Sequence, residues 1–396
     1  LIMAIRLGTT NIKNIYLGAV EVLAVYFGNN IVYKSITKYV SDYSARVIAD
    51  GGTVESLTNV TTIAQNLRNS DLFERLTLLF VPSGVKAGKA YVLIPEDGTG
   101  SLTVVRNTTA TYFNSSMILV SAAANVARYT YLTVGGNSFL LDEPQRTNLL
   151  PQGEALNNGS FFNTNAATIS LVSVLNPANS LASFEYRLNN STGDTQFIRV
   201  NPNATYASNV KHTYSIFIKY GSFQFCKLSY INFLGSYTVA VFDLVNGVLG
   251  ATAASGTGAA FNDSKIKSLQ NGWFRISISG TLLSSAGNPM NFEFNKVSSA
   301  NPTFSNFGRE SQTTTTADFC YLDRAQLEVG DLTSYIPTAG SAVTRNADVI
   351  TRTPPTGTVK IITTFSDDTT QVLTTIPATY TTPEGLIKSI AMNNVL

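Results

Sequence analysis

Apolar and polar residues alternate along most of this chain, with the period of two that places successive side chains on opposite faces of a β-strand. The alternation is clear from Phe274 to Ser279, directly after an Asn-Gly turn signal and Trp273. Residues 250–260, which are rich in Gly and Ala, are expected to form a loop. The pattern predicts a mainly β fold, with a sandwich of two antiparallel sheets over residues 150–345 and strands at 169–174, 183–188, 195–200, 214–220, 225–231, 238–243, 273–279, 291–294 and 319–327.

Residues 1–37 contain a repeat with a period of ten, in which short β-branched runs end in Gly. A strand-turn unit of this length cannot bury its apolar face alone, so the units must stack on something. Two interpretations remain open: a β-meander docked on the same chain, or a module that anchors and oligomerises several chains. The apolar positions that recur, and would make these contacts, are Leu7, Leu17, Phe27, Ile12, Val22 and Val32.

Residues 38–80 change to a helical spacing. Apolar residues recur there at intervals of three and four, which predicts two short helices separated near Asn69; these residues are Ile63, Leu67, Leu72, Phe73, Leu76, Leu79 and Phe80. Residues 81–149 are predicted to be a β linker, and residues 346–396 a small C-terminal β-tail. A sheet that small is marginal alone, so the tail is expected to pack on the sandwich or on neighbouring subunits.

Charged residues make up only 13% of the chain and the net charge is +2, which gives no indication of a nucleic-acid or anionic-membrane partner. We recognise no signal-peptide pattern and no apolar run of about 18 residues that predicts a membrane span. Cys226 and Cys320 lie in apolar, strand-like segments. We therefore expect both to be buried free thiols.

Catalytic patterns are weak in this sequence. The single histidine, His212, precedes a predicted strand and is expected at the surface or at a strand edge. There is no Gly-x-Ser-x-Gly motif and no Cys/His constellation. We therefore expect a protein that is not an enzyme. Two carboxylates that line one groove would instead indicate a polysaccharide depolymerase.

Several strings resemble those of one family. "NGWFRISIS" at 271–279, "AQLEVGDLTSYIPTAGSAVTRNAD" at 325–348 and "LLDEPQRTNLL" at 140–150 are similar to the carbohydrate-binding-module-like jelly rolls, and the linkers before them, of bacteriophage fibre proteins. "GGTVES" at 51–56 is similar to fibre proteins of crAss-like and other Bacteroidetes phages. The ten-residue repeat also resembles N-terminal anchoring segments of phage fibres. In the linker, Arg128, Arg146 and Glu143 are candidates for a buried charge network that ties the linker to the sandwich.

The resemblance implies a structural protein of the virion, a head or tail fibre, with a jelly roll that adheres to host-surface glycans. It implies a homo-oligomer, expected to be a trimer, whose N-terminal region binds other virion proteins of the capsid or tail. The localisation implied is the virion surface. The alternatives are a purely architectural virion protein and, less favoured, a depolymerase.

Sugars stack on exposed aromatic faces, so aromatic residues of the sandwich are the candidates for glycan binding. We single out Trp273, Tyr230 and Tyr237, while the position of Trp273 beside a turn and a strand also fits a core residue. No cofactor is expected, although jelly rolls of this kind often hold a structural Ca²⁺ on carboxylates and carbonyls. Asp142, Asp194 and Asp323 are the candidate carboxylates for such an ion.

Overall fold

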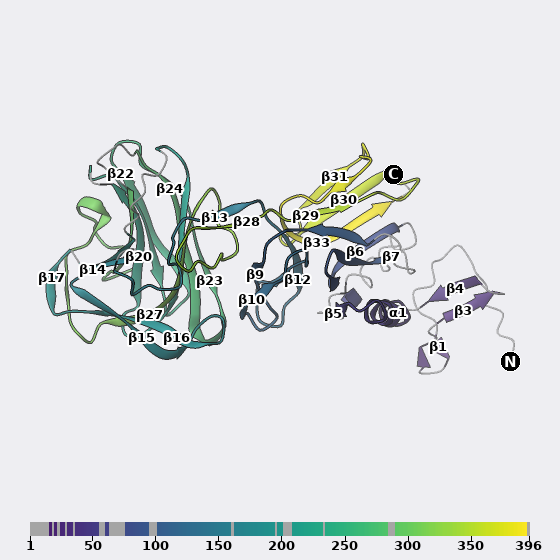
Figure 1. The fold of residues 1–396 in the computed structure, drawn as a ribbon, viewed down its shortest axis with the longest axis horizontal. Helices are drawn as coiled ribbons and strands as arrows, with labels where there is room; N and C mark the ends of the chain where they lie inside the picture. Colours follow the sequence, from purple (N-terminus) through teal and green to yellow (C-terminus); the bar gives the residue numbers. More distant parts are fainter. Residues whose placement is uncertain are drawn as a thin grey trace.

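The computed structural model describes residues 16–17, 20–21, 24–27, 30–34, 36–54, 60–62, 76–94, 101–159, 162–194, 196–200, 208–232, 234–283 and 290–393. Strands dominate these residues, which confirms the predicted mainly β fold. Figure 1 shows two bodies side by side, a sandwich and a second sheet, with short strands between them. No helix among the residues just given is both long and apolar enough to cross a membrane.

The sandwich has two antiparallel sheets of six strands each, as the alternation predicts. The first runs β14 (Phe162–Asn165), β18 (Phe197–Val200), β25 (Met290–Lys296), β20 (Phe225–Asn232), β21 (Tyr237–Asp243), β22 (Val248–Ser255). The second runs β15 (Ala167–Leu175), β16 (Leu181–Leu188), β27 (Phe319–Val329), β19 (His212–Lys219), β24 (Trp273–Thr281), β23 (Ala260–Ser268). Apolar side chains of both sheets meet between them, among them Ile216, Leu228, Ile276, Phe294 and Leu322. Burying each such side chain stabilises the fold by about 1.5–3 kcal/mol.

An eleven-stranded sheet, here called the platform sheet, forms the second body. Its main path is β11 (Tyr129–Tyr131), β12 (Ser138–Asp142), β33 (Gly385–Asn393), β6 (Leu76–Lys86), β7 (Lys89–Ile94), β8 (Leu102–Val105), β29 (Val349–Arg352), β32 (Tyr380–Thr381). β30 (Lys360–Phe365), β31 (Thr370–Leu373) and β5 (Thr53–Val54) join at its sides. The platform sheet thus combines the linker with the C-terminal tail, which the sequence pattern treats as separate segments. The tail packs on the linker strands, because β33 pairs with β12 and β6, and its packing on neighbouring subunits stays a prediction.

Several short two-stranded sheets lie outside the sandwich and the platform sheet. β13 (Arg146–Asn148) pairs with β28 (Val343–Arg345) and β9 (Ala110–Phe113) pairs with β10 (Leu119–Ala122), and both pairs lie where the two bodies meet (Figure 1). β17 (Ser191–Gly193) pairs with β26 (Gln312–Thr314). Two single turns, η2 (Gln270–Gly272) and η3 (Asn306–Gly308), precede β24 and β26.

A helix does lie in the predicted helical region, but not where the spacing placed it. α1 spans Ile36–Ala49, buries Val40, Tyr43 and Val47 on one face and contacts β6 and β7. The helix expected around residues 72–80 is wrong in its second half, since Leu76 begins strand β6. A short apolar run suits either element, and pairing with β33 and β7 on both sides selects the strand. Ile63, Leu67, Leu72 and Phe73 lie outside the described residues.

The N-terminal repeat forms strand-turn units. β1 (Tyr16–Leu17) pairs with β2 (Val20–Glu21), and β3 (Ala24–Phe27) pairs with β4 (Asn30–Lys34). Leu17, Phe27 and Val32 therefore lie in strands, whereas Leu7, Ile12 and Val22 lie outside the described residues. Whether the repeat anchors and oligomerises the chain stays a prediction.

The loop expected at 250–260 is shorter than predicted and covers only residues 256–259, because β22 extends to Ser255 and β23 begins at Ala260. The small residues of this stretch have a packing reason. A Cβ atom on Gly250 would lie 2.6 Å from the carbonyl oxygen of Ala300, which is closer than side-chain contacts allow. The composition therefore reflects a strand pressed against a neighbouring loop.

Candidate binding cleft

A buried charge network joins the platform sheet to the last residues of the sandwich segment. Arg106 Nη1 lies 2.7 Å from Asp348 Oδ1, and Arg128 Nη2 lies 2.8 Å from Glu143 Oε2. Arg128 also pairs with Asp348, and Arg345 pairs with Glu143. Burial alone would raise the pKa of Glu143, but Arg128 and Arg345 outweigh it and lower that pKa to about 2.

The network confirms the sequence prediction for Arg128 and Glu143 but not for Arg146. The Nη1 atom of Arg146 donates to the carbonyl oxygen of Gln145 at 2.9 Å, and no ion pair joins it to this network among the described residues. Asp348 and Arg345, which sequence reasoning missed, take its place; both lie within the family-like string at 325–348.

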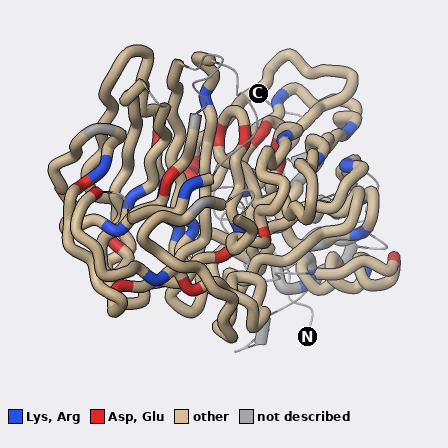
Figure 2. Tube along the Cα trace, turned by 60° about the vertical axis from the view of Figure 1, so that its left-hand side comes forward, with Lys and Arg blue, Asp and Glu red and all other residues tan. Residues whose placement is uncertain are grey.

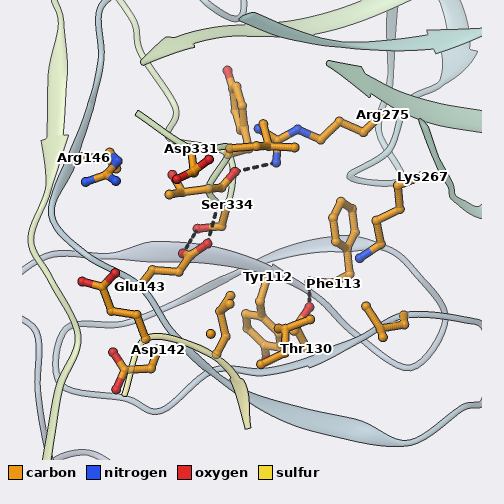
Figure 3. Close-up of a pocket in the computed structure, with 18 of the residues that line it drawn as sticks. Tyr112, Phe113, Thr130, Asp142, Glu143, Arg146, Lys267, Arg275, Asp331 and Ser334 are labelled. Carbon is orange, nitrogen blue, oxygen red and sulfur yellow. Dashed lines mark hydrogen bonds between the residues drawn. The ribbon is translucent and has the colours of Figure 1, made fainter. Parts of the chain in front are cut away.

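A cleft of about 510 Å³ opens beside this network, between the sandwich and the platform sheet (Figure 3). Its lining comes from five places in the chain: β9 to β12, the residues after β12, strands β23 and β24, residues 331–335, and the start of β33. Clefts at the junction of two bodies, lined by aromatic and a few polar groups, are preferred sites for small ligands.

The sandwich wall of the cleft is cationic. Lys265 and Lys267 are two positions apart on β23 and therefore share one face, while Arg275 on β24 is the register partner of Lys267. Lys267 Nζ donates to the carbonyl oxygen of Tyr131 at 3.2 Å and lies 4.4 Å from the centre of the Phe113 ring. Burial and the nearby Arg275 lower the pKa of Lys267 to about 8.

The platform wall is acidic and aromatic. Asp142 at the end of β12, Glu384 just before β33 and Tyr112 on β9 line it. Figure 3 shows Asp142 and Glu143 across the cleft from Arg275 and Lys267. Over the whole molecule the charges are interspersed, so the separation of charge is a local feature of the cleft (Figure 2).

Two consecutive carboxyl groups of this wall have very different pKa values. Burial raises the pKa of Asp142 to about 7, against a hydrogen bond from the Thr382 hydroxyl that lowers it. Glu143 is held ionised, and its oxygens accept hydrogen bonds from the backbone and hydroxyl groups of Ser334, both at 2.7 Å, and from Arg345. The acceptor positions of Glu143 are therefore occupied by the protein itself.

The aromatic residues predicted to bind glycan do not line the cleft, and two are buried. Trp273 is fully buried, and its Nε1 donates to the carbonyl oxygen of Leu175 at 2.7 Å. Tyr230 is stacked on Phe292 in the sandwich core, with ring centres 4.5 Å apart. Neither can offer its face to a sugar, so those two predictions are wrong. Tyr237 is half-buried at the start of β21, against Gly308.

His212 is likewise buried, with 1% of its surface exposed, which corrects the surface position expected for it. It begins β19, which has β24 on one side and β27 on the other, so the ring is enclosed. Its Nδ1 lies 2.9 Å from the carbonyl oxygen of Val210 and 3.2 Å from the Tyr230 hydroxyl. Burial lowers its pKa.

The three carboxylates considered for Ca²⁺ are not brought together. Asp142 accepts from Thr382, Asp194 from Ser305, and Asp323 from Arg324. Within the described part of the chain, no group of three or more His, Cys, Asp or Glu side chains is placed to hold a metal ion. Cys226 and Cys320 are buried free thiols, as predicted.

The cleft residues Tyr112, Lys267 and Arg275 were missed at the sequence level. The alternation from Phe274 to Ser279 places Arg275 on the polar face of its strand, but that face lies against residues 331–335 rather than in water. One signal was present: charged residues alternate at Asp263, Lys265 and Lys267 along one face of β23. Only the tertiary structure places that face opposite the platform sheet.

Comparison with known proteins gives no family for this chain. No family model and no curated protein matches it. One solved structure with a detectable likeness contains the CBM22-1 and GH10 modules of Clostridium thermocellum endo-1,4-β-D-xylanase 10B complexed with xylohexaose. The identity is 11% and the TM-score 0.25; the match covers 43% of this chain and only 26% of that one. A TM-score this low assigns no function to the chain, which its own structure defines as a β-sandwich joined to a second sheet.

Proposed function

We propose that this protein is a structural component of a bacteriophage virion, a head or tail fibre that projects from the particle and binds a glycan of the host surface. The observation that carries the binding role is the cleft of about 510 Å³ between the sandwich and the platform sheet. The virion role rests on the resemblance of the strings at 140–150, 271–279 and 325–348 to phage fibre proteins.

A sugar suits the chemistry of the cleft. Tyr112 is half-buried there and supplies an aromatic surface, against which the apolar face of a sugar ring packs. Carboxyl groups of Asp142 and Glu384 accept hydrogen bonds from hydroxyls, and Lys267 donates them. A purely apolar ligand would leave these charged groups without water or partners.

Binding without hydrolysis is the favoured form of this activity, although several carboxylates line the cleft. A glycosidase needs one carboxyl as acid and a second that is free to act as base or nucleophile. Glu143 is committed to Arg128, Arg345 and Ser334, and Asp331 is paired with Lys211. These pairings leave Asp142 and Glu384 as the carboxyl groups of the cleft that could act on a sugar, so a depolymerase stays the less favoured third candidate after the adhesin and the architectural role.

The N-terminal repeat is proposed to trimerise the chain and to bind other virion proteins. Trimerisation would present three clefts on one fibre and raise a weak affinity for each glycan site by multivalency. Sedimentation velocity of the full chain tests this part. We expect a trimer, and a shift to monomer in Phe27→Asp; a wild-type monomer would contradict it.

A purely architectural role is the second candidate, and one surface feature favours it. β15 is an edge strand of the sandwich, and β16 is its neighbour. Leu171 on β15 is 61% exposed, and Leu181 on β16 is 64% exposed. Exposed leucines on an edge strand are typical of a surface that packs against another protein.

The experiment that separates the two roles is binding of the fluorescently labelled full chain to host cells and to polysaccharide stripped from them. An adhesin gives saturable binding that Tyr112→Ala weakens and Tyr220→Ala leaves unchanged. Tyr220 is a suitable control because it is 42% exposed and lies outside the cleft. No binding by folded wild-type protein would favour the architectural role.

A further inference from the structure

The sandwich wall of the cleft holds two cations, Lys267 and Arg275, that form no ion pair within 4.0 Å among the described residues. The carboxylates of Glu328 and Glu143 act on Arg275 only from a greater distance. Arg275 donates to the carbonyl oxygen of Thr333 at 2.8 Å and to the Ser215 hydroxyl at 3.0 Å, which are both neutral oxygens. Its Nε has no hydrogen-bond partner in the described structure. Lys267 donates to a neutral carbonyl, and within the described residues no carboxylate lies within 4.0 Å of either cation.

Arg275 is an exception among the buried arginines of this chain. Arg106 and Arg128 pair with Asp348, Arg345 pairs with Glu143, and Arg309 pairs with Glu293. A buried charge without a paired opposite charge is unfavourable. Among the residues that the structure describes, Arg275 is the one buried arginine without a carboxylate at ion-pair distance, and it lies in the wall of the cleft.

Lys267 stands directly opposite Arg275 in the register of β23 and β24. The proximity of the two cations is also what depresses the pKa of Lys267, after burial. An ammonium group carries three donors, and the contact with Tyr131 uses one of them. In Figure 3 the side chains of Lys267 and Arg275 come from the same side of the cleft.

A further cation of the cleft lining, Arg146, donates to the carbonyl oxygen of Gln145 and acts electrostatically on Asp331, and the other charges at the cleft are paired or lie on the platform wall. Lys265 has Asp263 at 3.3 Å, and Asp331 has Lys211. Asp142 and Glu384 on the platform wall would repel an anion. An anionic group in the cleft is therefore favoured at one wall only, and the ligand's neutral hydroxyls are favoured at the other.

We infer that the glycan bound in the cleft is acidic, with a carboxylate such as that of a hexuronic acid recognised by Lys267 beside Arg275. This inference rests on the proposed function. The sugar carboxylate would accept hydrogen bonds from the Lys267 ammonium and lie in the positive field of Arg275. Ring hydroxyls would face Asp142 and Glu384, which fixes the direction in which the sugar enters.

The test compares acidic polysaccharides with the same polymers after their carboxyl groups have been reduced to primary alcohols. Polygalacturonate, alginate and hyaluronate, each with its carboxyl-reduced form, are titrated calorimetrically into the wild-type full chain, Lys267→Met and Lys388→Met. Lys388 is the control because it pairs with Asp368 at the surface, outside the cleft. Thermal unfolding establishes that each variant is folded.

We expect one or more of the acidic polymers to bind wild type about tenfold more tightly than its carboxyl-reduced form. A charge-assisted hydrogen bond from Lys267 to the sugar carboxylate supplies a difference of that size. Lys267→Met should lose that preference and bind both forms alike, while Lys388→Met retains it. Equal wild-type affinity for both forms, or a preference that survives in Lys267→Met, overturns the inference.

Two further results separate the inference from the proposed function. Binding of wild type to neutral host glycans alone overturns the acidic ligand and leaves the adhesin role standing. Absence of binding to every acidic, reduced and neutral glycan by folded protein overturns both.

Discussion

Arg106 and Asp348 form a buried ion pair, with Nη1 and Oδ1 2.7 Å apart, although 242 positions separate them in the sequence. Arg106 follows strand β8 and Asp348 precedes β29, which are neighbours in the platform sheet. The pair therefore fixes the place where the chain leaves the sandwich and re-enters the platform sheet. It also holds Arg128, and through Arg128 it holds Glu143 beside the cleft.

Replacing the shared carboxylate should be strongly destabilising. In Asp348→Asn, Arg106 and Arg128 keep their buried charges but lose their common partner, so we expect the free energy of unfolding to fall by about 3–5 kcal/mol. Urea denaturation measures it. Asp368→Asn, at an exposed pair with Lys388, is the control and should change stability by less than about 1 kcal/mol. A small effect of Asp348→Asn would show that the network is not coupled to folding.

Trp273 should affect stability rather than binding. Trp273→Phe removes the hydrogen bond to Leu175 and leaves a void in a closed apolar cluster, at a cost of about 1–3 kcal/mol. Thermal unfolding and glycan titration on the same sample separate the two properties. Loss of glycan affinity without loss of stability would restore Trp273 as a binding residue.

Asp142 should make the protein less stable as the pH rises. Its pKa is about 7 when folded, above its ordinary value of 3.8, so between these values the folded state binds the proton more tightly. The stabilisation from this group is complete below about pH 4 and is lost as the pH rises through 7. Asp142→Asn should therefore gain stability relative to wild type on going from pH 4 to pH 8.

Asp331 supplies a control of opposite sign for that experiment. The hydrogen bond from Lys211 holds the pKa of Asp331 below its ordinary value, so its contribution is present at neutral pH and lost as the pH falls. Denaturation curves of wild type, Asp142→Asn and Asp331→Asn at a series of pH values measure the two opposite effects. A difference between wild type and Asp142→Asn that does not depend on pH would contradict the environment described for Asp142.

The two thiols should be unreactive in the folded protein. Burial raises the pKa of both Cys226 and Cys320, and neither has any exposed surface. Iodoacetamide at pH 8 should modify neither cysteine in native protein and both in urea, as read by intact mass. Rapid labelling of native protein would indicate that the sandwich opens.

The sandwich was largely predictable from sequence because its strands alternate visibly and Asn- or Gly-rich turns bound them. Phe274 to Ser279 alternates as predicted and forms part of β24. The platform sheet was not predictable from sequence, because its strands pair with partners that are distant in the chain. Ile387 of the tail pairs with Leu140 and Ile390 with Phe80, and nothing in a local pattern specifies those partners.

The site was less predictable than the fold for a related reason. Sequence identifies aromatic residues but not which face of a strand they occupy once a second sheet covers it. Trp273 and Tyr230 have the right chemistry for a sugar and the wrong location, since both are buried. Tyr112 lies on β9, in the short sheet where the two bodies meet, and Lys267 lies on β23 of the sandwich, so only the tertiary structure places them in one cleft.

The central claim is that the cleft between the two bodies is the glycan site, and hydroxyl-radical footprinting with and without bound polysaccharide tests it most directly. Leu132, which is 40% exposed in the cleft, and Tyr112 should become protected. Leu234 and Tyr220, which are 74% and 42% exposed outside it, should not change. Protection confined to the region of Tyr237, with Leu132 and Tyr112 as reactive as before, would contradict the account.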